Sequence, residues 1–185
     1  MDAKDTYTRS HSQTVARLCA LIATELGCAP EEVDRIRLAG LLHDVGKIGI
    51  PDAILNKPAK LDAQEYSQMK THTRLGHDIV KAADMPDEAR WVLHHHEHID
   101  GCGYPDGLSG EDIPLQSRII HVADAFEAMT SDRPYRMAPG EQFAIGELRS
   151  NAGSQFDSAV VAALLRALGL RPQDGEILRA SPVPA

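Results

Sequence analysis

The chain has 185 residues, enough for one domain with a sizeable core and too few to suggest two. Its longest apolar runs, such as VVAALLRAL, are much shorter than a bilayer span, and no basic segment followed by an apolar one opens the chain. Membrane insertion and a signal peptide are therefore not expected. The net charge of −8 disfavours binding to a nucleic-acid polymer and means that local cations must hold any anionic ligand.

The cysteine content indicates the compartment. Three cysteines are an odd number and lack the paired spacing of a metal site, which suits a reducing environment better than a disulfide framework. With no leader segment expected, we predict a cytoplasmic protein.

Two helices are predicted at the start of the chain. Apolar residues recur at spacings of three and four, which predicts a helix over 8–26 that ends where Gly27 can adopt a left-handed conformation. Pro30, followed by two glutamates, predicts the start of a second helix. We expect that helix to break at Gly46 and Gly49.

The following segments are also predicted to be helical. Asp62 with Glu65 three residues later is typical of a capping box and predicts a third, long helix. Asp87 is expected to cap a fourth helix, and Pro114, Pro139 and Asp157 are expected to start three more. Several short alternating runs bounded by turn residues are not found, so the predicted fold class is all-α, a single-domain bundle of about seven helices.

One long loop interrupts this helical pattern. It runs from His98 to Ile113 and contains four glycines and one proline. Loops of this length inside compact domains are usually functional. We expect the domain to span residues 1–175 and residues 176–185 to form a flexible tail.

Metal-ligating residue types follow the apolar stripes of several helices. They are His11, His43, Asp44, His72, His95, His96 and Asp124. Imidazoles and carboxylates from facing helices assemble metal sites in the cores of helix bundles. This mixture suits divalent iron, manganese, nickel or zinc. An aspartate between two imidazole groups can bridge two ions, and two ions ~3.5–4 Å apart activate water for phosphoester displacement.

Each of these residues also has an ordinary structural interpretation. A single helical histidine is usually a surface residue or a satisfied core residue, and the dipeptide HD is a weak signal. The segment LLHDVGKIGIP is stronger, because an apolar run precedes the pair, Gly46 permits a close approach, and Lys47 lies one helical turn from His43. A cation there suits a phosphate. The other histidines are interpreted as solvated or supporting residues, namely His77, His94, His98 and His121.

Several motifs together resemble one protein family. HDVGK, the lone His72, HHE, DGCGYP and RIIHVADAFEAMTSDRPYR are similar, in order and spacing, to the motifs of the HD-GYP family. This is a bacterial branch of the HD-domain phosphohydrolases, and the resemblance runs from Tyr7 to about Leu168. It implies metal-dependent hydrolysis of cyclic di-GMP to linear pGpG, and on to GMP, in second-messenger signalling.

The resemblance also implies roles for individual residues. The implied metal ligands are His11, His43, Asp44, His72, His95, His96 and Asp124, with Asp44 bridging. His95 and His96 are chosen over His94 because Glu97 and Asp100 then fall in the family frame. Asp44 and Lys47 are the implied catalytic residues. The implied substrate-binding residues are Lys47, Asp100, Gly101, Gly103, Tyr104, Pro105, Arg133 and Arg136. Arg133 has an alternative role in a surface ion pair.

Departures from the family pattern refine these expectations. Tyr7 stands four residues before His11, where some members carry a glutamate associated with a third metal, and a phenol is a poor ligand for a hard ion. We therefore expect two divalent ions, with iron or manganese favoured and nickel, zinc, magnesium and calcium left open. His98 and Ile99 replace a basic residue and an aromatic one. The expected small-molecule partner is a cyclic dinucleotide. The expected protein partners are a second copy of the chain, a sensor or receiver domain, or a diguanylate cyclase-type protein.

The motifs leave two other classes of function open. The chain can be a phosphohydrolase for another cyclic nucleotide or dinucleotide, although the GYP loop disfavours a mononucleotide. It can also be a cyclic dinucleotide receptor or an interaction module with little catalysis. The complete set of ligand positions counts against the second class, because a degenerate module is free to lose one.

Overall fold

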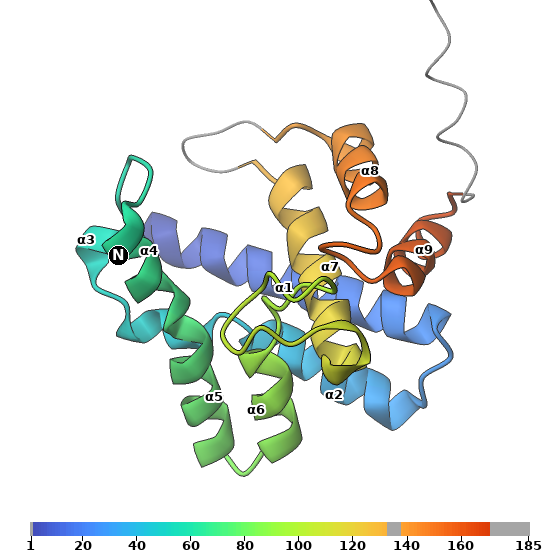
Figure 1. Cartoon of the computed structure of the whole chain (residues 1–185), viewed down its shortest axis with the longest axis horizontal. Coiled ribbons are helices and arrows are strands. Elements are labelled where there is room, and N and C mark those ends of the chain that lie inside the picture. The colour runs from blue at the N-terminus through green and yellow to red at the C-terminus, as the bar shows by residue number, and fades with distance from the viewer. Residues whose placement is uncertain (1, 133–137, 171–185) are drawn as a thin grey trace, which may run out of the picture.

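A computed structural model describes residues 2–132 and 138–170, with side chains from Ser10 onward. Within these residues it contains nine α-helices, two short 3₁₀ helices and no strand (Figure 1), which confirms the all-α class. The α-helices are α1 (Asp2–Glu25), α2 (Pro30–Leu42), α3 (Asp52–Leu55), α4 (Ala63–Lys70), α5 (His72–Ala82), α6 (Pro86–Leu93), α7 (Leu115–Thr130), α8 (Glu141–Ser150) and α9 (Ser158–Ala167). The 3₁₀ helices are η1 (Val45–Gly49) and η2 (Gly110–Asp112).

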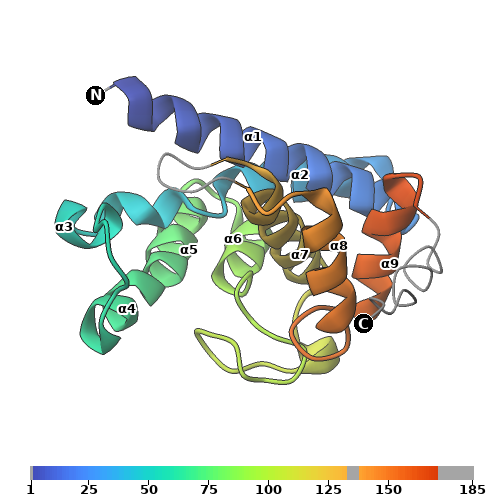
Figure 2. The same ribbon diagram turned by 90° about the horizontal axis from the view of Figure 1, so that it is seen from above.

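The long helix α1 organises the bundle. It lies along one side of the molecule and packs against α2, α7 and α9 (Figure 2), while α5 packs against α6 and η1. The core includes Val15, Leu18, Ile22, Ile36, Ile119, Ile120, Leu148 and Leu164. Each such side chain contributes about 1.5–3 kcal/mol when removed from water, so this apolar seam stabilises the frame that carries the polar site.

Local capping signals are confirmed where the side chain itself makes the cap. Asp62 accepts hydrogen bonds from the backbone of the first turn of α4, and Glu65 bonds back to Asp62, which completes a capping box. Asp157 caps α9 through its side chain, which accepts hydrogen bonds from the backbone N–H groups of Ala159 and Val160. Gly27 has a φ of 81°, so the predicted left-handed stop after α1 is present.

Other helix boundaries differ from expectation. The first helix begins at Asp2, not at residue 8. The helix that Asp87 was expected to cap begins at Pro86, so Asp87 lies inside its first turn. Proline at the first helical position needs no hydrogen-bonded N–H, so it starts that helix one residue earlier. The helix expected from Pro139 begins at Glu141.

The predicted long third helix is wrong, because it divides at Thr71 into α4 and α5. Thr71, His72 and Thr73 each donate a side-chain hydrogen bond to the carbonyl three residues earlier. These bonds compete with the regular backbone pattern and turn the chain. The division places His72 at the start of a new helix, and together with the four-residue α3 it explains why there are more helices than the seven expected.

The expected close approach at Gly46 is confirmed. A Cβ atom on Gly46 would lie 2.0 Å from the carbonyl oxygen of His72 and 2.4 Å from the amide nitrogen of Gly76. Only a glycine allows η1 to contact the start of α5 in this way. The contact brings the segment after His43 against the segment that carries His72.

Two further expectations concern membrane insertion and the C-terminal tail. Among the described residues, no helix combines the length and the apolar character needed to cross a bilayer. The tail expected at 176–185 lies outside the described residues.

Candidate metal centre

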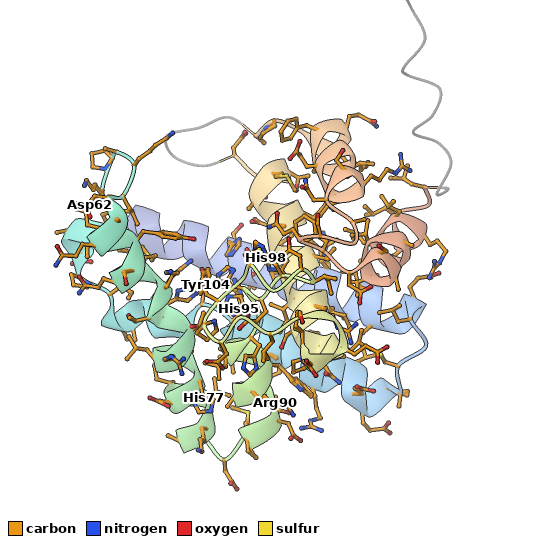
Figure 3. All side chains as sticks on the ribbon, viewed as in Figure 1. Asp62, His77, Arg90, His95, His98 and Tyr104 are labelled. Atoms are coloured by element: carbon orange, nitrogen blue, oxygen red, sulfur yellow. The ribbon has the colours of Figure 1, made fainter. Side chains whose placement is uncertain are left out.

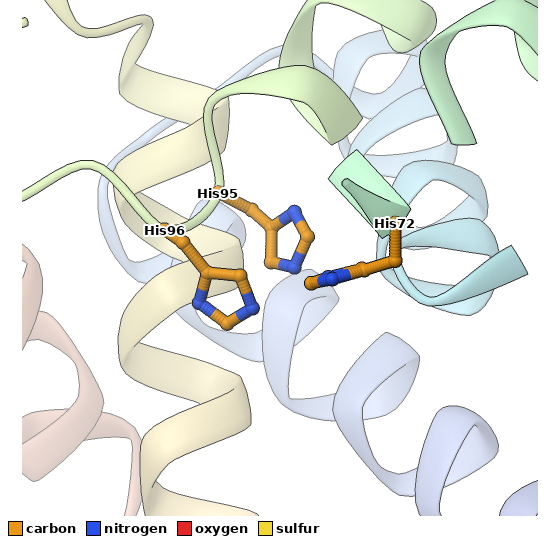
Figure 4. Close-up of side chains that lie close together, drawn as sticks. All are labelled: His72, His95 and His96. Atoms are coloured by element: carbon orange, nitrogen blue, oxygen red, sulfur yellow. The ribbon is translucent and has the colours of Figure 1, made fainter. Parts of the chain in front are cut away.

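Two groups of three potential ligands lie in the interior of the bundle. One consists of His72, His95 and His96, and Figure 4 shows their rings turned toward a common centre. The other consists of His11, His43 and Asp124. Within each group the potential ligand atoms lie within 4.8 Å of one another. Six of the seven predicted ligands thus form two triads from five segments of the chain.

The seventh predicted ligand, Asp44, lies between the two groups. Its Oδ1 is 3.5 Å from Nε2 of His72, in the first group. Its Oδ2 is 3.3 Å from Nε2 of His43 and 3.9 Å from Nε2 of His11, in the second. One carboxylate therefore presents one oxygen to each group, which is the arrangement required of a bridging ligand.

Helix ends orient three of the imidazoles. His43 follows the last residue of α2, His72 opens α5, and His95 follows the end of α6. In each ring Nδ1 lies 2.6–2.8 Å from the carbonyl oxygen three residues earlier. Carbonyls at helix ends lack a partner within the helix, so they accept a hydrogen bond from Nδ1 and assign the proton to that atom. The Nε2 lone pair of each ring is then directed into the site.

These Nε2 atoms provide the test of whether a metal fits. The Nε2 atoms of His43, His72 and His95, and Oδ1 of Asp44, are buried and have no hydrogen-bond partner. Leaving such atoms without a partner costs about 1–3 kcal/mol each. Imidazole nitrogens anchored through the opposite ring atom, together with a carboxylate oxygen, form a donor set suited to divalent transition-metal ions. The residues present therefore fit the metal site expected from the sequence.

The charge state of the first group favours coordination. Burial lowers the pKa of His95 well below its usual value, and the charge of His43 acts in the same direction. Burial likewise lowers the pKa of His96 and of His72. These imidazoles are neutral near pH 7, which is the form that binds a metal ion.

The second group is more strongly influenced by carboxylates. Burial lowers the pKa of His43, but the negative charges of Asp44 and Asp124 outweigh burial and raise it to about 9. Burial alone would raise the pKa of Asp44, but the positive charges of His43 and Lys47 hold it well below its usual range. The electrostatic field that attracts a proton to His43 equally attracts a divalent cation.

His11 is oriented by a residue that the sequence did not single out. Its Nδ1 contacts Oε2 of Glu127, which is almost completely buried, while its Nε2 lies 3.4 Å from Oδ1 of Asp124. Glu127 and Asp124 are three residues apart on one face of α7. The spacing of three from Asp124 could have identified Glu127 in the sequence. Glu127 is a carboxylate that contacts the ring atom of His11 opposite its Nε2.

His121 is a second supporting residue. It is buried on α7 and its Nδ1 donates to the carbonyl oxygen of His95. Burial lowers its pKa to about 4, so the ring is neutral. His94 contacts Asp106 and His77 contacts Asp78, while His98 lies beside the ring of His121. None of these four histidines belongs to either group of ligands described above.

Lys47 lies at the edge of the metal centre. Its Nζ is 2.5 Å from Oδ2 of Asp44, and its side chain is 36% exposed. The predicted phosphate-binding cation is thus already paired with the candidate bridging carboxylate. The pairing means that a change at Lys47 also affects Asp44, and the expected contact of Lys47 with a phosphate stays a prediction.

The loop that follows His96 is held by one buried carboxylate. Glu97 is 2% exposed and accepts hydrogen bonds from the backbone N–H groups of Asp106, Gly107 and Leu108. Gly103 packs so closely on this residue that a Cβ atom there would lie 2.4 Å from the Cα atom of Glu97. Glu97 belongs to the HHE motif, but residue spacing did not reveal the three backbone N–H groups that it binds.

Tyr104 connects this loop to the metal centre. Its ring lies 4.9 Å from the ring of His96, centroid to centroid, and its backbone N–H donates to the carbonyl of His96. Figure 3 labels Tyr104 and His95 near the centre of the view. The peptide bond to Pro105 is cis. Tyr104, like Lys47, is thus a member of the predicted substrate set that lies against a candidate ligand.

The remaining predicted substrate-binding residues fall into two sets. Asp100 and Gly101 form a turn, in which the Asp100 carboxylate accepts from the N–H of Cys102 and Gly101 has a φ of 80°. Arg133 and Arg136 lie outside the described residues. Their role in substrate binding stays a prediction.

The sequence matches the HD domain family over residues 2–160, so the chain belongs to that family. It is 42% identical over 169 residues to the cyclic di-GMP phosphodiesterase response regulator RpfG of Xanthomonas campestris pv. campestris, covering 90% of this chain and 45% of that protein. It is 40% identical over 175 residues to the 3′3′-cGAMP-specific phosphodiesterase 3 of Vibrio cholerae, covering 94% of this chain and 38% of that protein. These matches confirm the resemblance to HD-GYP proteins.

The fold is shared with solved structures. An HDG"Y"P protein from Bdellovibrio bacteriovorus superimposes with a TM-score of 0.70 at 21% identity, covering 91% of this chain and 55% of the other. The chain spans less than half the length of the two curated relatives above.

Proposed function

We propose that this chain is a metal-dependent phosphodiesterase that hydrolyses cyclic di-GMP to linear pGpG and on to GMP. The observation that carries the proposal is Asp44, whose two oxygens face two separate groups of metal-ligating side chains. The catalytic domain spans residues 1–175 in this proposal.

The proposed cofactor is a pair of divalent ions, iron or manganese. His72, His95 and His96 would hold one ion, His11, His43 and Asp124 the other, and Asp44 both. Such ions supply positive charge to phosphoryl oxygens and make a water molecule nucleophilic near neutral pH.

Other residues orient the histidine rings and contact the substrate. The carbonyls behind His43, His72 and His95 keep each ring in the tautomer that presents Nε2. Lys47 offers a partly exposed ammonium beside Asp44, where negative charge develops on the phosphate during attack. Tyr104 packs on His96 and presents its ring to the sugar or base of the substrate.

A second substrate is supported by a specific observation. The 40% identical relative from Vibrio cholerae is named as specific for 3′3′-cGAMP. The two dinucleotides differ in one base, so the metal centre alone does not discriminate between them. Contacts to the bases decide the preference.

Turnover of the purified protein tests the proposal. Protein loaded anaerobically with Fe²⁺ or Mn²⁺ is incubated separately with cyclic di-GMP, 3′3′-cGAMP and cyclic di-AMP, and the products are separated by chromatography. We expect the highest kcat/KM for cyclic di-GMP, with pGpG appearing before GMP. An Asp44→Asn variant controls for contaminating enzymes, and circular dichroism verifies its folding.

Each alternative class gives a distinct result. A higher kcat/KM for 3′3′-cGAMP would transfer the assignment to the mixed dinucleotide. Binding of cyclic di-GMP without any turnover at full metal occupancy would identify a receptor and refute the phosphodiesterase proposal.

A further inference from the structure

Lys70, the last residue of α4, is in an unusual environment for a lysine near the metal centre. Its Nζ lies 5.2 Å from the ring centroid of Tyr66 and 5.7 Å from that of Tyr104. Lys47 and Lys57 are both paired with carboxylates. Within the described residues, no carboxylate lies within ion-pair distance of Lys70. Its positive charge is therefore available to an anion.

Lys70 lies near the metal centre both along the chain and across the fold. Along the chain it is two residues before the candidate ligand His72. Across the fold it contacts Tyr104, whose ring rests on the candidate ligand His96. The ring of Tyr104 thus separates Lys70 from the candidate ligands. Lys70 is therefore placed to contact a part of the substrate that does not react.

Tyr66 offers an aromatic surface at the same place. It is 49% exposed, and its ring meets that of Tyr104 edge to face at 6.5 Å. Because Tyr66 contacts Tyr104 edge to face and about half of it is exposed, its ring can stack on a nucleobase. Tyr66, Lys70 and Tyr104 together combine a cation with aromatic rings.

The chemistry of a cyclic dinucleotide matches this combination. The molecule has two phosphodiesters and two purines, and only one phosphodiester is at the reacting centre at a time. The second phosphate needs a cation, and the net charge of −8 means that the protein as a whole does not supply one. Two tyrosine faces hold the ammonium in place without neutralising it.

We propose that Lys70 and Tyr66, with Tyr104, form the subsite for the non-reacting half of a cyclic dinucleotide. Lys70 contacts the second phosphate, and the exposed ring of Tyr66 stacks on a purine. This inference rests on the proposed function and identifies two residues that the sequence did not assign to the substrate.

The test compares two substrates on the intact, Mn²⁺-loaded protein. Cyclic di-GMP has a second phosphate and purines, whereas bis(p-nitrophenyl) phosphate has one phosphodiester and neither. Lys70→Met keeps most of the stem and removes the charge, so KM for cyclic di-GMP should rise about tenfold, as expected for loss of a charge-assisted hydrogen bond. The loss in kcat/KM for bis(p-nitrophenyl) phosphate should be much smaller, and Lys70→Arg should restore most of the cyclic di-GMP rate.

Parallel variants test the aromatic part. Tyr66→Leu should raise KM for cyclic di-GMP about tenfold by removing base stacking, and Tyr66→Phe should behave nearly like the unmodified protein. Lys81→Met, on the exposed far end of α5, is the matched control for loss of a lysine and should not change KM. Metal content and melting temperature are measured on each preparation.

A binding measurement separates this inference from the proposed function. Calorimetry with the hydrolysis-resistant bis-phosphorothioate of cyclic di-GMP should show about tenfold weaker binding to Lys70→Met, and the effect should shrink as salt is raised. If the unmodified protein binds the analogue but hydrolyses no dinucleotide, the proposed function fails while the subsite is still tested. Equal losses on both substrates, or unchanged binding to Lys70→Met, would overturn the subsite.

Discussion

The Nζ atom of Lys47 lies 2.5 Å from Oδ2 of Asp44, so the cation expected to face phosphate also neutralises the candidate bridging carboxylate. The two residues are three positions apart at the start of η1, and the contact is therefore local. Lys47→Met removes the charge and keeps most of the stem. We expect kcat to fall about 10²-fold, the scale seen when one electrostatic stabiliser is lost, while folding and metal content survive.

Lys47→Arg is the matched variant for this prediction, since it retains the charge and should keep more of the rate than methionine does. Steady-state kinetics, metal analysis and melting temperature are measured on the same preparations. A lower melting temperature with an intact rate per folded molecule would show that Lys47 acts only through its pairing with Asp44.

Asp44→Asn should reduce metal occupancy in both groups, because one carboxylate faces each of them. Elemental analysis of protein from iron- or manganese-supplemented cells should give about two ions per chain for the unmodified protein and less than one for the variant. Asp78→Asn, at an exposed site on α5, is the control. A stable content of three ions, with Tyr7 near the third, would contradict the two-metal proposal.

Glu97→Gln should loosen the loop that carries Tyr104. Glutamine keeps one acceptor but directs an amide N–H₂ at backbone N–H groups that now have charged acceptors. We expect a loss of stability of about 2 kcal/mol and a higher KM for cyclic di-GMP with a smaller change in kcat. Hydrogen exchange over residues 98–108 should accelerate. Glu111→Gln, an exposed glutamate of the same loop region, should change neither quantity.

Glu88 gives a prediction for stability as a function of pH. Its Oε1 lies 2.6 Å from Nε of Arg35, and this hydrogen bond lowers the pKa of the Glu88 carboxyl below its ordinary value. A lowered pKa in the folded state means that the stabilisation is complete above the unfolded pKa, about 4.3, and disappears as pH falls through the folded pKa.

Glu88→Gln should therefore lower the free energy of unfolding by about 1 kcal/mol at pH 7. The difference from the unmodified protein should vanish at pH values well below 4. Urea denaturation of both proteins at a series of pH values measures it, with Glu111→Gln as the control. A difference that is constant with pH would show that the Arg35 contact does not depend on the Glu88 charge.

Much of the fold could be predicted because its signals are local. The capping box at Asp62 involves residues three positions apart, so spacing alone identified it. The break at Thr71 could not be predicted from periodicity. It depends on three side chains that compete with the backbone for carbonyl oxygens, and nothing in the apolar pattern reports that competition.

The sequence by itself determined the all-helical class and the chemical types of the candidate ligands. Only the tertiary structure decided which atoms meet. Glu127 contacts His11 across 116 positions of the chain, Asp44 turns one oxygen to each histidine group, and Lys70 approaches Tyr104. Helical periodicity specifies the face on which a side chain lies, but not the helix that packs against that face. The relative placement of α1, α5 and α7 follows from burial of the shared core, which is a property of the whole chain.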